Sequence, residues 1–346
     1  MKQYFTFKNR KYGVISLGEI MLRLSSPVNE VIFQGNTFEK QIGGSELNVI
    51  AGLESLGTRG AVISKIPNNE LGRFVKKMVR AYGVSDDFLI YDNSNEKRLG
   101  IYYYEYGAFP RKPSVIYDRN NSSFSNLILE EINEKVFSSA EIFHLSGITL
   151  GLTKNLTNIS IELIKKFKEN GTLISFDVNF RSTLWSEKEA RNIIEKILPY
   201  VDILFISEES LRKMFGKTGT LEDIIITFSK QHNISVIAST KREVISPKKH
   251  NFSSTIYSNE QNKFFKESPY VDIDVIDRIG SGDAYLSGAL FGILKYNNLQ
   301  KAVEFGNAMS VLKNTILGDL SCVSFDLVSQ TILEHNSDSC HSELNR

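Results

Sequence analysis

The segment from residue 271 to residue 294 places a carboxylate beside a glycine-rich turn: VDIDVIDRIGSGDAYLSGALFGIL. An alternating apolar stretch precedes Gly280-Ser281-Gly282, and Asp283 follows at the start of a predicted helix. Such a turn directs several backbone N–H groups and the positive end of the helix dipole to one point. The arrangement is typical of a phosphoryl-binding site with a general base, here Asp283, next to it.

Asp283 also has an interpretation without chemistry, because aspartate is favoured at helix N-termini. The segment alone leaves both interpretations open.

Two better-known glycine loops are excluded. A dinucleotide-binding fingerprint requires glycine where this chain has Tyr285, and Gly216-Lys217-Thr218 lacks the leading glycine of a P-loop, since Leu211 stands in its place.

A second candidate site is GGSELN at residues 43–48, which leads into a helical pattern. Gly43 and Gly44 permit close approach of the backbone to a ligand. Asn48 can donate and accept hydrogen bonds from the first turns of the helix. A small polar ligand would suit these groups. An ordinary loop-to-helix junction is the simpler interpretation of this segment taken alone.

The elements that must position these residues are short apolar strands alternating with helices. Helices are predicted at 69–83, ending at Gly83, and at 153–171, ending at Asn170-Gly171. The alternation predicts an α/β fold with a mostly parallel sheet covered on both faces, and a binding crevice at the carboxyl ends of the strands. The predicted strands are VISLG (14–18), AVISK (61–65), EIFHLSG (141–147), TLISFDV (172–178), DILFIS (202–207) and SVIAST (235–240).

The motifs GGSELN and DRIGSGD, separated by this alternation, resemble those of the ribokinase-like carbohydrate kinases over about residues 14–333. The second motif of that family usually reads D-T-x-G-A-G-D. Arg278 and Ser281 depart from it, while Asp283 and both glycines are retained. The resemblance implies a ribokinase-like three-layer αβα sandwich over residues 1–335. It also implies a small β-sheet lid from about 22–41 and 98–119, and a polar tail at 336–346.

Six segments in the right order resemble one branch of the family, whose members phosphorylate 2-keto-3-deoxygluconate. They are GEIMLRLSSP (18–27), LGIYYYEYGAFPRKPSVIYDR (99–119), DVNFRSTLWS (177–186), ILFISEES (203–210), VIDRIGSGD (275–283) and LKNTILGD (312–319). The resemblance implies transfer of phosphate from ATP to the 6-hydroxyl, giving the 6-phosphate and ADP. Asp283 would take the hydroxyl proton, and the amides from Gly280 to Asp283 would form the anion hole. A kinase for a neutral ketose such as fructose, and a catalytically silent sugar-binding regulator, remain open alternatives.

The resemblance also implies which residues hold the sugar. These are Gly43, Gly44, Asn48, Tyr102, Tyr117, Arg119, Arg181 and Asp319. An arginine fork suits a carboxylate because it donates paired hydrogen bonds, which a neutral hexose does not require. The alternative for the tyrosines and arginines is a strand with ordinary aromatic enrichment and surface charges.

On the nucleotide side, the resemblance implies contacts from a second set of residues. These are Asn179, Arg181, Thr240, Lys241, Arg242, Gly280, Gly282, Lys313 and Asn314. The family often has Asn-x-x-Glu near the hydrated Mg²⁺, whereas this chain has Ser207-Glu208-Glu209-Ser210. The final acid is absent. The ATP phosphates and water would then be the main ligands of Mg²⁺, with Glu209 as the candidate substitute for the missing acid.

The composition fits small-molecule partners, here a sugar acid and ATP. The 346 residues include 41 basic and 40 acidic side chains without a long like-charge run, so nothing indicates binding to nucleic acid or an anionic membrane. Cys322 and Cys340 form no metal or redox motif. No stretch approaches the roughly 20 apolar residues of a membrane helix. We expect a reduced, cytoplasmic protein that forms a homo-oligomer, with His144 as a core residue.

Overall fold

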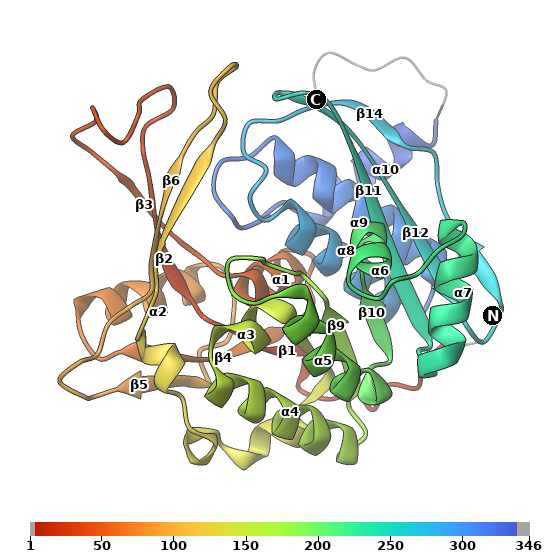
Figure 1. Cartoon of the computed structure of the whole chain (residues 1–346), viewed down its shortest axis with the longest axis horizontal. Helices are drawn as coiled ribbons and strands as arrows, with labels where there is room; N and C mark the ends of the chain where they lie inside the picture. Colours follow the sequence, from red (N-terminus) through yellow and green to blue (C-terminus); the bar gives the residue numbers. More distant parts are fainter. Residues whose placement is uncertain (1–3, 338–346) are drawn as a thin grey trace.

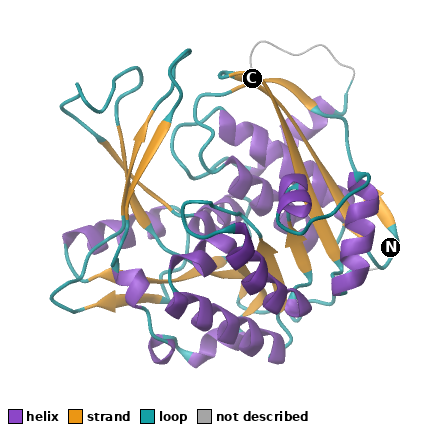
Figure 2. Ribbon diagram, viewed as in Figure 1, coloured by secondary structure: helices purple, strands orange, loops and turns teal. Residues whose placement is uncertain are grey.

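The computed structural model describes residues 4–337, which form a three-layer α/β sandwich with a small separate sheet at one edge (Figures 1 and 2). The central sheet has the order β13-β12-β11-β10-β9-β8-β1-β4-β5, with β14 pairing to β12. All pairs from β11 to β5 are parallel, and β12 pairs antiparallel with β11, β13 and β14. The strands are β1 (Tyr12–Leu17), β4 (Gly60–Pro67), β5 (Leu89–Asp92), β8 (Ala140–Ser146), β9 (Leu173–Asp177), β10 (Ile203–Phe205), β11 (Val236–Ser246), β12 (Lys249–Ser258), β13 (Lys263–Phe265) and β14 (Tyr270–Asp274).

The small sheet is the predicted lid, and it stands beside the main body in Figure 1. Its order is β3-β2-β6-β7, and the two inner strands, β2 and β6, run parallel to each other. The outer strands run antiparallel to their neighbours. The bounds are β2 (Met21–Ser25), β3 (Glu39–Gly43), β6 (Ile101–Glu105) and β7 (Ser114–Asp118).

Helices cover both faces of the central sheet. Alternate residues of a strand point to opposite faces, so the apolar strand residues form a core on each side. Val14 packs in the core beneath α1, α2, α8, α9 and α10, whereas Ile15 packs in a second core beneath α3 to α7. The helices are α1 (Ser45–Ser55), α2 (Glu70–Ala81), α3 (Gly147–Leu152), α4 (Lys154–Glu169), α5 (Glu187–Ile197), α6 (Glu208–Lys213), α7 (Leu221–His232), α8 (Ser281–Tyr296), α9 (Leu299–Asn314) and α10 (Phe325–His335). Short 3₁₀ helices occupy Ser123–Asn126, Leu129–Glu131, Glu134–Ser138 and Leu198–Tyr200.

Local sequence signals explain where the two predicted helices begin and end. The Asn69 side chain accepts hydrogen bonds from the first turn of α2, and the helix stops just before Gly83, which has a φ of 78°. Thr153 caps α4 in the same way, and Gly171, with a φ of 72°, follows its end. These predictions are confirmed.

The six predicted strands are confirmed, with boundaries shifted by a few residues. The alternating residues from 271 onward form β14, as predicted, whereas the edge strand β5 and the antiparallel strands β12 and β13 were not predicted. Strand β11 continues to Ser246, beyond the predicted end at 240. The structure describes residues 336 and 337 but not the remainder of the predicted tail at 336–346. No helix within residues 4–337 combines the length and apolar character required to cross a membrane.

Candidate active site

The predicted anion-binding turn lies at the N-terminus of α8. Gly280 caps the helix with a φ of 81°, and a Cβ there would come within 1.9 Å of the Asp319 carbonyl oxygen, so glycine is required. A Cβ on Gly282 would meet nothing within 4 Å. The first intrahelical amide bond runs from Ala284 to Gly280 at 2.8 Å. The amides of Gly282 and Asp283, which precede Ala284, are therefore available to a ligand.

Asp283 is held by the first turn of α1, so the two predicted motifs meet in space. Its Oδ1 accepts a hydrogen bond from the Ser45 hydroxyl at 2.7 Å, and its Oδ2 accepts one from the Asn48 amide at 2.7 Å. Burial raises the pKa of Asp283 to about 6, against these two hydrogen bonds, which favour the ionised form. A carboxylate with this pKa is largely ionised at neutral pH and can accept a proton.

The paired glycines before α1 allow close packing of the lid on the main body. A Cβ on Gly43 would lie 2.2 Å from Asp319 Oδ2, and one on Gly44 would lie 2.2 Å from the Glu19 carbonyl oxygen. Asp319 also accepts a 2.6 Å hydrogen bond from the Tyr102 hydroxyl. Gly43, Tyr102 and Asp319 are therefore brought together, as the resemblance implied.

Tyr117 and Arg119 lie at the end of the lid strand β7. The Tyr117 ring is 5.8 Å from that of Tyr102, and Tyr117 is half exposed. The Arg119 guanidinium forms an ion pair with Glu19, donating through Nε at 2.8 Å and through a second nitrogen. Arg119 is thus already paired with an acid that the sequence interpretation did not include. A substrate carboxylate would have to share it.

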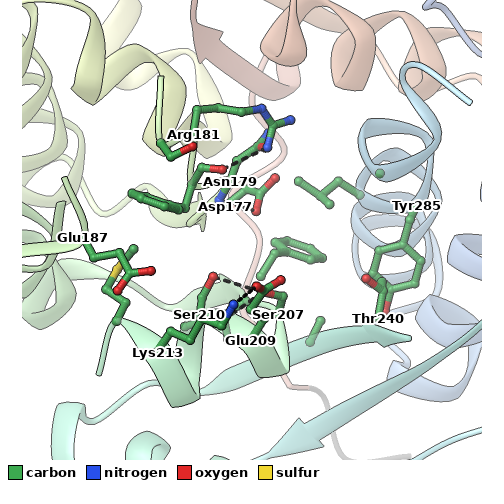
Figure 3. A pocket seen from close by; sticks show the side chains of 18 of the residues that line it. Asp177, Asn179, Arg181, Glu187, Ser207, Glu209, Ser210, Lys213, Thr240 and Tyr285 are labelled. Atoms are coloured by element: carbon green, nitrogen blue, oxygen red, sulfur yellow. Dashed lines mark hydrogen bonds and ion pairs between the residues drawn. The ribbon is translucent and has the colours of Figure 1, made fainter. Parts of the chain in front are cut away.

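A cavity of about 620 Å³ opens at the carboxyl ends of β9, β10 and β11, the predicted place for a crevice (Figure 3). Its lining comes from these strands and from α6 and α8. It includes five site residues predicted from the sequence, which are Asn179, Arg181, Glu209, Thr240 and Gly282.

Asp177 is an acid of this cavity that sequence reasoning missed. It ends β9, and its pKa is raised to about 7 by burial and, secondly, by the charge of Asp283. Its Oδ1 accepts a 3.1 Å hydrogen bond from the backbone N–H of Asn179, whose side-chain amide donates to Ser45 at 3.1 Å. The signal was present, since Asp177 directly follows a buried strand at the crevice.

Arg181 reaches the same cavity with an exposed side chain. Its only hydrogen bond within residues 4–337 goes to the Phe180 carbonyl oxygen at 3.1 Å. The guanidinium favours the ionised form of Asp177. Of the two arginines predicted to bind the sugar, Arg119 is paired with a carboxylate and Arg181 is not.

The segment predicted to lie near a metal lines the cavity at the start of α6. Ser207 caps this helix by accepting a 3.1 Å hydrogen bond from the Ser210 amide, and Glu209 pairs with Lys213 at 2.6 Å. Within residues 4–337 no group of three or more His, Cys, Asp or Glu residues could hold a metal ion. The Glu209 carboxylate lines the cavity but is paired with Lys213, so its role at Mg²⁺ stays a prediction.

Lys313 and Asn314 were expected beside the adenine, but neither lines the cavity. Lys313 is fully buried and donates to the Asp277 and Ile316 carbonyl oxygens at 3.0 and 2.9 Å. The Asn314 carbonyl accepts from the amides of Ile276 and Asp277. The two residues support the segment that leads into the anion-binding turn. Their contact with a nucleotide stays a prediction.

Lys241 and Arg242 follow Thr240 along β11 and are exposed, outside the cavity lining.

His144 is buried, as predicted. Its Nδ1 lies 2.9 Å from the Ser175 hydroxyl, and burial lowers its pKa to about 3.

The large, mostly parallel sheet with a small four-stranded lid is the architecture of the ribokinase-like sugar kinases. The profile of the pfkB family carbohydrate kinases matches residues 12–324, and the chain belongs to this family. It is an ATP-dependent carbohydrate kinase, so the predicted family is confirmed.

Three relatives illustrate the similarity within this family. The chain is 31% identical over 319 residues to a 2-dehydro-3-deoxygalactonokinase from Haloferax volcanii, covering 92% of this chain and 96% of the relative. The crystal structure of a 2-dehydro-3-deoxygluconokinase from Thermotoga maritima matches with a TM-score of 0.88 and 33% identity, over 93% of this chain and 98% of that one. A pfkB family carbohydrate kinase from Listeria grayi gives a TM-score of 0.86 at 28% identity, covering 93% and 99%.

Proposed function

We propose that this protein transfers a phosphoryl group from ATP, with Mg²⁺, to the 6-hydroxyl of 2-keto-3-deoxygluconate, giving the 6-phosphate and ADP. The observation that carries the proposal is the position of Asp283. Its carboxylate is bonded to Ser45 and Asn48 on the side where the lid packs, and its own amide belongs to the open turn of α8. A base and an anion-binding turn are thus joined in one residue.

Asp283 accepts the proton of the 6-hydroxyl as that oxygen bonds to the γ-phosphorus and the bond from phosphorus to the β–γ bridging oxygen breaks. The amides of Gly282 and Asp283 donate hydrogen bonds to the transferred phosphoryl oxygens, where charge spreads during transfer. Mg²⁺, when bound, neutralises charge on the phosphates of ATP. Thr240 and Asn179 line the cavity, which supports their assignment to the nucleotide side of the site.

Two arginines support a substrate with a carboxylate. Arg181 lies at the cavity with a charge that no bonded acid neutralises, and Arg119 lies at the base of the lid with its charge shared by Glu19. A guanidinium can bind two carboxylates through different N–H groups, so the Glu19 pair orients Arg119 and leaves donors for a ligand.

The galactonate stereoisomer is a second candidate substrate, because the Haloferax volcanii relative at 31% identity is a 2-dehydro-3-deoxygalactonokinase. The two acids differ at one hydroxyl, so the same carboxylate contacts serve both.

A coupled assay of ADP release over 2-keto-3-deoxygluconate, 2-keto-3-deoxygalactonate and fructose tests the proposal. We expect kcat/KM for at least one keto-deoxy acid to exceed that for fructose about 100-fold or more. A preference for fructose would replace the proposal with a neutral-ketose kinase. No turnover with any sugar, despite binding, would indicate the silent regulator.

A further inference from the structure

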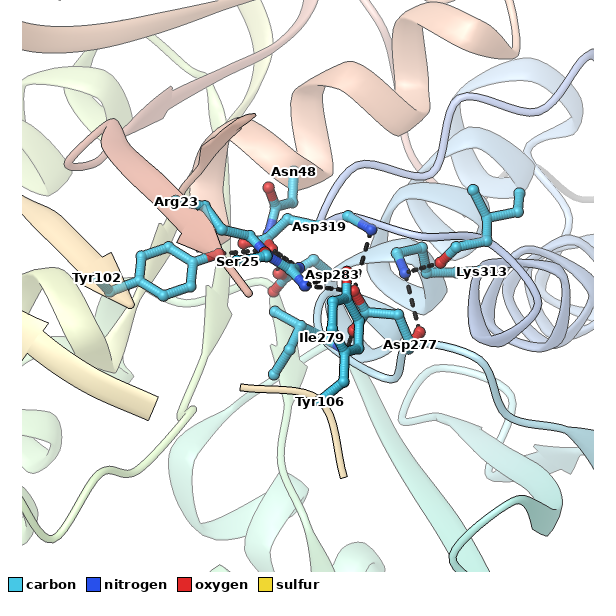
Figure 4. Close-up of polar contacts among 12 residues, drawn as sticks. Arg23, Ser25, Asn48, Tyr102, Tyr106, Asp277, Ile279, Asp283, Lys313 and Asp319 are labelled. Atoms are coloured by element: carbon cyan, nitrogen blue, oxygen red, sulfur yellow. Dashed lines mark hydrogen bonds and ion pairs between the residues drawn. The ribbon is translucent and has the colours of Figure 1, made fainter. Parts of the chain in front are cut away.

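Arg23 lies on the lid strand β2, yet its guanidinium is fully buried between the lid and the main body (Figure 4). It forms ion pairs with two carboxylates, that of Asp277 at 2.5 Å and that of Asp319 at 2.7 Å. These partners are 254 and 296 residues away along the chain. Arg23 is therefore a direct link from the lid to two loops of the main body.

Both loops border the anion-binding turn. Asp277 Oδ1 accepts a hydrogen bond from the Ile279 amide at 3.0 Å, and its Oδ2 accepts one from the Gly318 amide at 3.0 Å. Asp277 thereby ties the residues just before Gly280 to the loop that carries Asp319. The same loop packs its Asp319 carbonyl oxygen against Gly280. The conformation of the turn depends on these contacts.

The guanidinium of Arg23 has little capacity left for a ligand. Its Nε donates to the Ser25 hydroxyl at 2.7 Å, and the nitrogen that binds Asp277 also donates to the Tyr106 hydroxyl at 3.2 Å. The group lies over the Tyr104 ring at 4.3 Å. Four of the five N–H donors of an arginine are accounted for by the contacts to Ser25, Asp319, Asp277 and Tyr106. Arg23 is thus unlike Arg181, whose guanidinium is exposed.

If the lid moved without these loops, Asp277 and Asp319 would be left buried without their counter-charge, which is strongly unfavourable. The lid strand and the two loops must therefore shift together. We propose that Arg23 is a positioning residue that couples the seating of the lid to the formation of the phosphate-binding turn. A sugar that holds the lid against the main body then also orders the Gly282 and Asp283 amides, which stabilise phosphoryl transfer. The proposal rests on the assignment of the turn under Proposed function.

Arg23→Lys tests the coupling, because an ammonium keeps the charge but lacks the planar fork that spans two carboxylates. Arg98→Lys is the matched control, since Arg98 is a partly exposed arginine at the lid, paired with Asp118. Each protein is studied with the sugar that the wild type phosphorylates, a keto-deoxy acid or fructose. An error in the proposed substrate therefore leaves this test intact.

We expect Arg23→Lys to lower kcat about tenfold or more while KM for the sugar changes less than about threefold. In hydrogen exchange without nucleotide, sugar should protect both the lid strands and residues 279–283 of the wild type and of Arg98→Lys. In Arg23→Lys, sugar should protect the lid alone.

Protection of the turn in Arg23→Lys equal to that in the wild type, with kcat unchanged, would overturn the proposal. The wild type alone provides a second test if the variant fails to fold. Sugar that protects the wild-type lid without protecting residues 279–283 would also refute the coupling.

Discussion

The Asn48 amide lies 2.7 Å from the Asp283 carboxylate, across 235 residues of sequence. Asn48 belongs to the first turns of α1, and Asp283 belongs to the first turn of α8, so the N-termini of two helices meet at the Asp283 carboxylate. Hydrogen bonds and helix dipoles both favour the ionised carboxylate, whereas burial opposes it. The balance leaves a carboxylate that is buried and yet charged at neutral pH.

Asp283→Asn should lower kcat by roughly 10²- to 10⁴-fold, because the proton acceptor is lost while the hydrogen-bonding shape is retained. ATP binding, followed by calorimetry, should be nearly unchanged. Asp326→Asn, at an exposed position on α10, is the control for the loss of one surface charge. Turnover by Asp283→Asn close to that of the wild type would reduce Asp283 to a helix cap.

The pKa of Asp283 at about 6 predicts how activity depends on pH. Because the base must be ionised, kcat/KM should fall about tenfold for each unit of pH below 6 and should level off above it. The Asp283→Asn variant should lose this limb from its residual activity. A profile for the wild type that stays flat down to pH 5 would contradict the assignment.

The free energy of unfolding should fall as pH rises, whereas kcat/KM should rise. Asp177 and Asp283 have pKa values raised to about 7 and about 6, so folding favours their protonated forms. Their contribution to stability is fully present below the ordinary aspartate pKa and is lost as pH rises through 6 and 7. Asp283→Asn should therefore be more stable than the wild type at pH 8, by at most about 3 kcal/mol. Urea denaturation at pH 5 and pH 8 measures the difference.

Two glycine substitutions should separate folding from catalysis. Gly280→Ala places a methyl group 1.9 Å from the Asp319 carbonyl oxygen at a φ of 81°, so it should lower the free energy of unfolding, by about 2 kcal/mol or more. Gly282→Ala meets open space in the protein, so its stability should be near that of the wild type. We expect the added methyl group to crowd a phosphoryl group bound at this turn, so kcat should fall. Equal activity of Gly282→Ala and wild type would place the transferred group elsewhere.

The ion pair between Arg119 and Glu19 predicts opposite effects for its two members. Arg119→Leu should cost a keto-deoxy acid about 2 to 5 kcal/mol in kcat/KM, whereas the low activity expected with fructose should stay nearly unchanged. Glu19→Gln frees the guanidinium for the substrate, so it should lower KM for the acid. Arg98→Leu is the control. An equal loss for both sugars would mean that the pair holds the base of the lid instead of reading a carboxylate.

The turn at Gly280–Asp283 could be located from sequence because its glycines directly precede a helical pattern. The alternation of strands and helices likewise predicted the sandwich, since each of the six predicted strands is apolar enough to be recognised alone. Arg23 could not be predicted. An arginine in a short strand of a lid is ordinarily a surface residue, and its burial depends on Asp277 and Asp319, which are more than 250 residues away. The pairing of Glu19 with Arg119, which is 100 residues away, was likewise not predicted.

The pairing of the lid strands also sets the mechanical behaviour of the lid. Met21 pairs with Gly43, and Ile101 pairs with Asp118, so all four connections to the main body leave the lid sheet at the same end. The parallel pairing of β2 with β6 places Met21 and Ile101, where the two inner strands begin, at the same end of the sheet. Glu19, Gly43 and Arg119 lie at this attached end, while the loops at 26–38 and 106–113 lie at the free end (Figure 1). A small rotation of the sheet at its attached end would thus move the loops at the free end through a larger distance.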